Sequence, residues 1–380
     1  MKKHFTSYIL ITILGGVINA QYSFSQTSIS LSNGAALSYQ SGDIDLSDYR
    51  GEMNDVIYHP PDGGMLTAET ITIQTDKHAQ DENSKTNKTI YKLVEINKGK
   101  IASIQEQYHL SADLIELRDF PHSLIAQLLE IGGDDNLSWD IKTASPKLEL
   151  LDVDFSGNGI IAESEKIKGS ITPILNNPAN SPRLVNFELM IENSDIIPVG
   201  DSELATRLAS ILSDLELQKL TLSLSTKSQY LQINNIQQIE LRLTARQLFS
   251  VAITLYIEYP VLENLTELEE SELAITLLQN IKLHKIEIEL EDFGLNARLP
   301  NTRLNEYHSS AKKLQNLVLA IMPANGQRLT TPIMQFVYNG GTLTLTSQPS
   351  TPKPVALIAS MLLFPDLLVK EFAISSEHHP

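Results

Sequence analysis

The sequence contains no cysteine among its 380 residues. This absence excludes disulfide bonds, thiol catalysis, iron–sulfur clusters, zinc sites with thiolate ligands and a lipid anchor attached to cysteine. Aromatic residues are also scarce, at 6% with a single Trp, although 42% of the chain is hydrophobic. We therefore expect a core made mostly of Leu and Ile, stabilised by burial and backbone pairing alone.

Motifs of several common enzyme classes are missing as well. The chain contains no phosphate-binding G-x-x-x-x-G-K-[ST], no G-x-G-x-x-G, no G-x-S-x-G elbow and no HExxH. Paired acids such as Asp134-Asp135 lie in loop-like surroundings without a supporting pattern. The sequence therefore predicts a protein that is not an enzyme.

Acidic residues outnumber basic residues, so the formal net charge is −17. Nucleic-acid binding requires a cationic surface, and docking on anionic lipid headgroups requires a basic patch. The net charge argues against both kinds of partner. Its simplest role is to keep the protein soluble.

The N-terminus has the pattern of a secretory signal peptide. Lys2 and Lys3 precede the short apolar run Tyr8–Val17, and small residues allow cleavage after residue 20 or 25. The run is shorter than the roughly 20 apolar residues of a membrane span. We expect export to the periplasm, with an uncleaved anchor as the alternative.

Hydrophobic periodicity predicts an α+β fold rich in β-structure. Apolar residues alternate in many segments, as at Ile286, Ile288 and Leu290, which predicts twisted antiparallel sheet built from repeated strand-hairpin units. Four or five short amphipathic helices are expected to pack on it. Their predicted positions are 121–130, 202–215, 262–279, 304–322 and 355–363. A polar loop is expected at 77–88 and a last strand at 367–374.

The chain is expected to form two β-rich parts after the signal peptide at 1–20. These are an N-terminal unit at 21–200 and a C-terminal α+β unit at 201–375, followed by a loose tail at 376–380. The segments 148–162 and 286–298 share an alternating run, an Asp-Phe pair, a turn with Gly and a second apolar run. This similarity indicates an internal repeat.

The stretch 148–165 allows two interpretations. As an EF-hand-like calcium loop, it has Gly159 at position 6 and offers ligands at positions 1, 3, 5, 7 and 12. Those ligands are Asp154, Ser156, Asn158, the carbonyl of Ile160, and Glu165. As a β-hairpin, it has a Ser-Gly-Asn-Gly turn between two apolar runs. The hairpin is favoured, because the following segment contains Gly169 and β-branched residues where an EF-hand needs a helix.

Leu and Ile on alternating strands beside amphipathic helices leave a further choice open. Such a sheet either encloses an apolar groove, which suits acyl chains, or is filled by its own core. The pattern itself favours the filled core.

Two segments resemble known families. The segment 62–73, a Gly-rich turn followed by L-x-A-x-x-I-x-I, resembles strands of AsmA-like and related uncharacterised envelope proteins of Gram-negative bacteria. Parts of 291–356 resemble a group of uncharacterised exported proteobacterial proteins. These resemblances imply an exported, β-rich envelope protein, and the AsmA-like group is associated with envelope lipid handling.

The sequence thus predicts a non-enzymatic periplasmic protein of the cell envelope. It is expected to be a structural or interaction module, or a lipid carrier with an apolar groove. Its expected partner is an envelope protein or a lipid, and no cofactor is expected. The alternative is a calcium-binding module at 154–165.

Overall fold

The computed structural model describes residues 21–30, 36–45, 50–59, 64–75, 90–102, 108–121, 145–173, 185–231, 235–259 and 279–380. The chain forms two compact units: unit 1 contains residues up to 173 and 191–206, and unit 2 contains 174–190 and 207–380. The expected signal peptide and the loop at 77–88 lie outside the described residues. The helices expected at 121–130 and 262–279 also lie outside them, apart from one terminal residue each.

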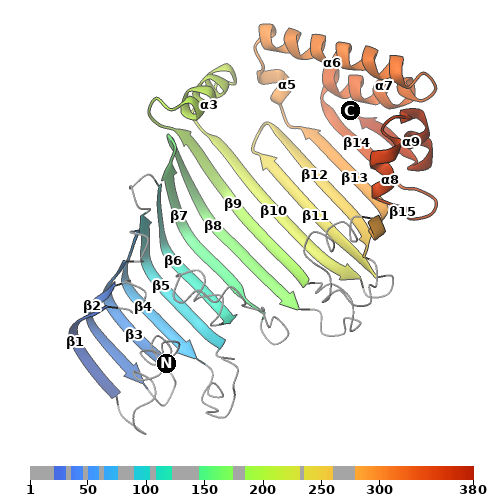
Figure 1. Cartoon of the computed structure of the whole chain (residues 1–380). Coiled ribbons are helices and arrows are strands. Elements are labelled where there is room, and N and C mark those ends of the chain that lie inside the picture. The colour runs from blue at the N-terminus through green and yellow to red at the C-terminus, as the bar shows by residue number, and fades with distance from the viewer. Residues whose placement is uncertain are drawn as a thin grey trace. The chain divides into compact units, whose positions relative to one another are not determined.

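Unit 1 is a meander of antiparallel strands, in which each strand pairs with the next one along the chain (Figure 1). The strands are β1 (Gln21–Ser30), β2 (Ala36–Asp45), β3 (Arg50–His59), β4 (Met65–Thr75), β5 (Ile90–Ala102), β6 (Tyr108–Pro121), β7 (Lys147–Gly157) and β8 (Ile160–Pro173). Strand β9 (Val185–Pro198) and helix α3 (Glu203–Asp214) have residues in both units.

Apolar residues in unit 1 line up across neighbouring strands on one face. One such row follows directly from the strand register and runs through Met53, Ile71, Ile96, Ile115, Leu150 and Ile167. Ile115 and Leu150 are buried, together with Ala112 and Val153, in the core cluster of this unit. Alternation along each strand and direct pairing across strands therefore place the core on a single face.

A row of polar residues crosses the same strands where the pairing is interrupted. The residues with positive φ in β3, β5, β7 and β9 are Asp55, Lys98, Asp152 and Asn193, whose φ angles lie between 47° and 51°. In β3, β5 and β7 the register skips these positions and the residues opposite them, which include Glu69, Asp113 and Glu165. The pairing resumes in the same register beyond each interruption. The interruptions therefore form one aligned row across the strands of unit 1.

Unit 2 combines antiparallel strands with the C-terminal helices. Its strands are β10 (Leu220–Leu231), β11 (Ile236–Ala245), β12 (Phe249–Glu258), β13 (Lys282–Asp292), β14 (Gly341–Ser347), β15 (Lys353–Pro354) and β16 (Ile374–His379). Its helices are α5 (Leu295–Arg298), α6 (Asn301–Ile321), α7 (Gly326–Asn339), α8 (Ala356–Met361) and α9 (Pro365–Glu371). Strands β10 to β14 pair in order, β15 pairs with β13, and β16 pairs with β14.

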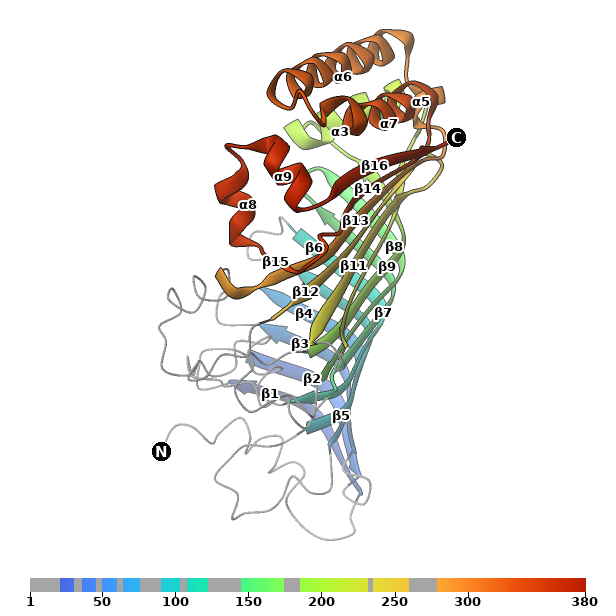
Figure 2. The same cartoon turned by 90° about the vertical axis from the view of Figure 1, so that its right-hand side faces the viewer.

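Helix α7 packs on β14 and β16, and α6 packs on α7 (Figure 2). Pro332 inside α7 has no N–H to donate to the carbonyl of Arg328. The Ser376 hydroxyl of β16 lies 3.4 Å from this carbonyl and donates to the Leu329 carbonyl at 2.7 Å. A polar contact from the sheet therefore compensates the helix near its proline.

No described helix is long and apolar enough to cross a membrane.

The expected fold class is confirmed, since the structure is rich in antiparallel strands with short helices beside them. The helices expected at 202–215, 304–322 and 355–363 correspond to α3, α6 and α8. The strand expected at 367–374 is wrong, because 365–371 form helix α9. Pro365 at the first helical position and Asp366 in the first turn favour a helix there.

Two further expectations need correction. The tail expected to be loose at 376–380 mostly forms β16, which gains hydrogen bonds by pairing with β14. The internal similarity holds for one strand only, because Asp154 lies in β7 whereas Asp292 ends β13 and precedes helix α5. The Asp292 carboxylate accepts hydrogen bonds from the backbone N–H groups of Gly294 and Leu295 at 2.8 Å and 2.6 Å. These bonds satisfy N–H groups at the start of α5, where the counterpart segment has a second strand.

Candidate functional site

The sheet of unit 2 has one apolar face, built by three rows of directly paired residues. The first row contains Leu224, Leu243, Val251, Leu290 and Leu343. The second contains Leu241, Ile253, Ile288 and Leu345, and the third contains Ile239, Leu255 and Ile286. These three rows are called the apolar face below. With strands about 4.8 Å apart, β10 to β14 make it about 19 Å wide.

Both ends of the apolar face are covered by packed side chains. Beyond the first row, Leu215, Ala245 and Leu248 form a buried cluster to which α5 contributes Leu295. At the third row, Ile257, Leu283 and Phe372 form another buried cluster, against which residues of α8 and α9 pack. The face is therefore closed along two of its borders.

The middle of the apolar face is not closed in this way. Within the described part of the chain, Leu243, Val251, Ile253 and their second-row neighbours belong to no buried cluster. They are half-buried, and Leu241 is 37% exposed. An apolar surface of this kind at the centre of a sheet is typical of a binding region. It is the best candidate for a functional site in unit 2.

The opposite face of the same strands is polar. Glu287, Glu289 and Glu291 alternate with the apolar residues of β13, and Thr342, Thr344 and Thr346 lie opposite them on β14. Arg242 of β11 approaches Glu289 to 3.9 Å. The two faces therefore differ in character along every strand, which is the pattern of a sheet with one wet side.

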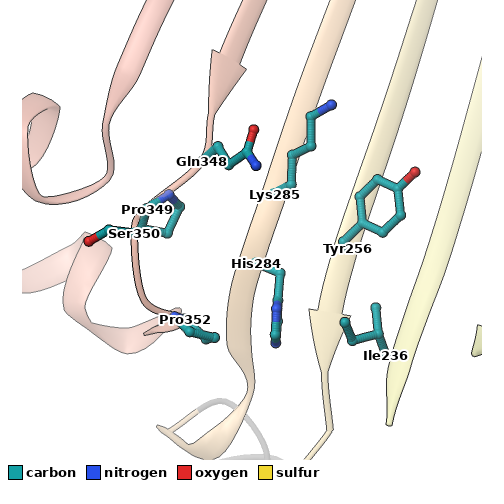
Figure 3. A pocket seen from close by; sticks show the side chains of 8 residues that line it. All are labelled: Ile236, Tyr256, His284, Lys285, Gln348, Pro349, Ser350 and Pro352. Atoms are coloured by element: carbon teal, nitrogen blue, oxygen red, sulfur yellow. The ribbon is translucent and has the colours of Figure 1, made fainter. Parts of the chain in front are cut away.

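A small pocket lies at the polar face, near the start of β13 (Figure 3). Its volume is about 310 Å³, at the lower end of the range for small-molecule sites. The residues that line it are Ile236, Tyr256, His284, Lys285, Gln348, Pro349, Ser350 and Pro352. Figure 3 shows His284 and Lys285 on β13, between Tyr256 of β12 and the segment 348–352.

The basic side chains in and beside this pocket lie close to acidic partners. His284 Nε2 lies 2.9 Å from Glu258 Oε2, and Lys282 Nζ lies 2.9 Å from Glu258 Oε1. Lys285 Nζ lies 2.8 Å from Glu287. Burial alone would raise the pKa of Glu258, but hydrogen bonds from Lys282 and His284 outweigh it and lower the pKa. His284 and Lys285 of the pocket therefore each have an acidic partner within the protein.

The five candidate calcium ligands lie along the β7–β8 hairpin. Asn158 and Gly159 form its two-residue turn with φ angles of 51° and 78°, between the paired residues Gly157 and Ile160. Positive φ at both central residues is the mark of a type I′ hairpin turn. The structure thus agrees with the hairpin interpretation of this stretch.

Two of the five positions make side-chain hydrogen bonds to other residues, and the other three are placed by the strand register. Asp154 pairs with Glu163 across the hairpin, whereas Glu165 accepts a hydrogen bond from Asn193 at 2.9 Å. The Asn158 amide donates to the Tyr108 hydroxyl at 2.9 Å. Ser156 pairs with Ile161, and Ile160 pairs with Gly157. The five positions follow two extended strands and do not wrap around a centre, so calcium binding here stays a prediction.

Sequence reasoning named no residue of the middle rows as a site. The alternation of apolar residues in β11, β12 and β13 was visible, but it is equally typical of a filled core. Only the positions of the helices show which rows are covered.

Comparison with protein families gives a match to the C-terminal part of the chain. A family model described as "Uncharacterized protein" matches residues 201–378, which include the apolar face and helices α5 to α9. A comparison with curated proteins finds no match to the chain. The match supports the expected resemblance to an uncharacterised family, and the AsmA-like resemblance stays a prediction.

Proposed function

We propose that the protein is a non-enzymatic carrier of the cell envelope that binds acyl chains on the apolar face of unit 2. The observation that carries this proposal is the half-buried middle of that face, between two closed borders. An acyl chain has no polar group along its length, so such a surface suits it without further contacts. The expected signal peptide and the AsmA-like resemblance of residues 62–73 support the location and the lipid ligand.

Burial of methylene groups makes the proposal quantitative. Each buried CH₂ contributes about 0.8 kcal/mol, which corresponds to roughly a fourfold change in affinity. We therefore expect affinity for uncharged long-chain alcohols to rise about fourfold per added methylene. The increase ends when the chain exceeds the apolar face.

The first experiment is native mass spectrometry of the mature protein, gently extracted from envelope fractions. A lipid-sized adduct would support the proposal and identify the ligand. Binding is then measured by displacement of a neutral fluorescent polyene from the purified protein. The test variant is Leu241→Gln with Ile253→Gln, which places two amides on the apolar face.

The matched control is Arg242→Gln with Thr254→Gln, one residue further along the same two strands and on the polar face. We expect the test variant to lose most of its affinity and the control to keep it. Circular dichroism checks that both variants are folded. Equal affinities in the two variants, or a bare polypeptide without polyene binding, would refute the proposal.

A further inference from the structure

The connection between α8 and α9 exposes a group of large apolar side chains. Leu362, Leu363, Phe364 and Leu367, called the apolar tip below, are 64%, 83%, 62% and 44% exposed. The backbone there is ordered by hydrogen bonds from Leu362 N to the Ile358 carbonyl and from Phe364 N to the Met361 carbonyl, at 3.1 Å and 2.8 Å. The fold therefore presents these side chains in a fixed turn.

The other side of the same two helices is apolar as well. Ile358, Met361 and Leu368 pack toward the cluster around Phe372, so the segment from α8 to the start of α9 has apolar side chains both inward and outward. No charged residue occurs between Lys353 and Asp366. A helical segment that is apolar all round is typical of burial or of contact with a membrane. These twelve residues are too few to span a bilayer, which takes roughly 20.

Helix α6 extends the exposed apolar surface. Leu314, Leu317 and Ile321 follow helical spacing and are each more than half exposed. The α6–α7 connection is joined to α9, because Asp366 Oδ1 accepts hydrogen bonds from the backbone N and the side-chain amide of Asn325 at 3.1 Å and 3.0 Å. Figure 2 shows the α8–α9 and α6–α7 connections on the same side of unit 2. The tip and the end of α6 thus belong to one region.

The charge of this region differs in sign from that of the chain. Residues 301–371 are called the helical cap below. They contain six Lys or Arg and three Asp or Glu, so their formal net charge is +3. Because the whole chain has a formal net charge of −17, the remaining residues have −20. Within the described residues, Arg303 and Lys353 have acidic partners, whereas no salt bridge is found for Lys312, Lys313 and Lys370. Exposed cations therefore accompany exposed Leu and Phe.

We propose that the helical cap docks on a bilayer containing anionic phospholipid, with the apolar tip inserted below the headgroups and Lys312, Lys313 and Lys370 facing phosphates. Apolar side chains with flanking Lys are the pattern of interfacial membrane binding. The net charge of the whole chain argued against an anionic membrane. At physiological salt, screening limits electrostatic interactions to about 8 Å. The local charge of the helical cap, and not the net charge of the chain, therefore determines how this region interacts with a membrane.

Because the chain contains no cysteine, a single introduced cysteine can be labelled specifically to test this proposal. Leu363→Cys in the mature chain is labelled with an environment-sensitive fluorophore and mixed with phosphatidylcholine vesicles, with or without phosphatidylglycerol. The control is Ile211→Cys on α3, where the native side chain is also exposed, at 54%. We expect a blue shift and a several-fold rise in emission at position 363 with anionic vesicles only, and no change at position 211.

Charge and apolar insertion are then separated. Lys312→Glu with Lys313→Glu is expected to weaken vesicle binding by an order of magnitude or more, because each basic residue near an anionic surface contributes roughly fivefold. Unlabelled Leu363→Ser with Phe364→Ser is expected to abolish co-sedimentation with vesicles while circular dichroism is unchanged. The apolar-face variant Leu241→Gln with Ile253→Gln is expected to bind vesicles normally, so this proposal and the carrier proposal fail independently.

Three results would overturn the proposal. The first is an unchanged spectrum at position 363 in the presence of vesicles. The second is an equal response at positions 363 and 211, which indicates non-specific adsorption. The third is a response at position 363 that depends on protein concentration without vesicles, which indicates a second copy of the chain on the tip.

Discussion

Replacement of Gly159 by Ala is expected to destabilise unit 1 strongly. Gly159 occupies the second position of the β7–β8 turn with φ +78°, a conformation that costs L-residues about 1–2 kcal/mol. A Cβ there would also overlap Ser202 Oγ and lie 2.9 Å from the carbonyl oxygen of Val199. Overpacking of this kind costs about 1–3 kcal/mol. The free energy of unfolding should therefore fall by about 2–5 kcal/mol.

The chain offers a control with nearly the same backbone conformation. Gly200 has φ +79°, but a Cβ at this position would meet no atom within 4 Å. Gly200→Ala should therefore lose only the conformational part, about 1–2 kcal/mol. The difference between the two variants measures the contact between the turn and the start of α3.

Urea denaturation followed by circular dichroism compares the two variants. Ser202→Ala adds a third measurement, because Ser202 Oγ accepts a hydrogen bond from Ala205 N at 3.0 Å and donates to the Asn158 carbonyl at 2.8 Å. In the Ser202→Ala background, Gly159→Ala should cost less, since part of the overlap is gone. Equal losses of unfolding free energy in Gly159→Ala and Gly200→Ala would refute the close contact between Gly159 and Ser202. No loss in either variant would refute the positive φ at these two glycines.

Two further predictions concern charged groups. Burial opposes the ionisation of Glu258, but hydrogen bonds from Lys282 and His284 outweigh it and lower the pKa of Glu258. The ionised Glu258 side chain therefore stabilises the fold at pH values above the ordinary pKa of 4.5. This stabilisation is lost as the pH falls through the lowered pKa. Glu258→Gln should therefore lower the melting temperature at neutral pH and flatten its decline in acid, and parallel curves for the two proteins would contradict this. For the hairpin, Asp154→Ala with Glu165→Ala should change the melting temperature little, with or without calcium, because both side chains are exposed. A calcium-induced rise in the native protein that this double variant abolishes would establish the calcium alternative.

Local patterns in the sequence were sufficient where each residue's environment follows from its neighbours along the chain. Alternation predicted β13, and helical spacing predicted α3 and α6, because each of these elements has a clear periodicity. Helix α7 was missed, although Leu329, Met334 and Val337 are spaced for a buried helical face. Pro332 inside it is an unfavourable signal, and the compensating Ser376 is distant in the sequence.

The candidate sites were predictable only in part. The hairpin at Asn158-Gly159 followed from turn chemistry, since both residues tolerate positive φ. The middle of the apolar face gave no separate signal, because alternating apolar residues are equally typical of a filled core. The apolar tip also gave none, because its Leu and Phe do not differ in type from buried residues.

The sequence by itself determined which residues alternate, where tight turns form and which chemistries the lack of cysteine excludes, since these depend on side-chain type and local backbone preference. The tertiary structure alone decided which apolar residues are covered. Phe372 is 2% exposed and Phe364 is 62% exposed, although they lie only eight residues apart, at the two ends of α9. Burial depends on which distant strands and helices pack against a residue, and both the apolar face and the apolar tip arise from that packing.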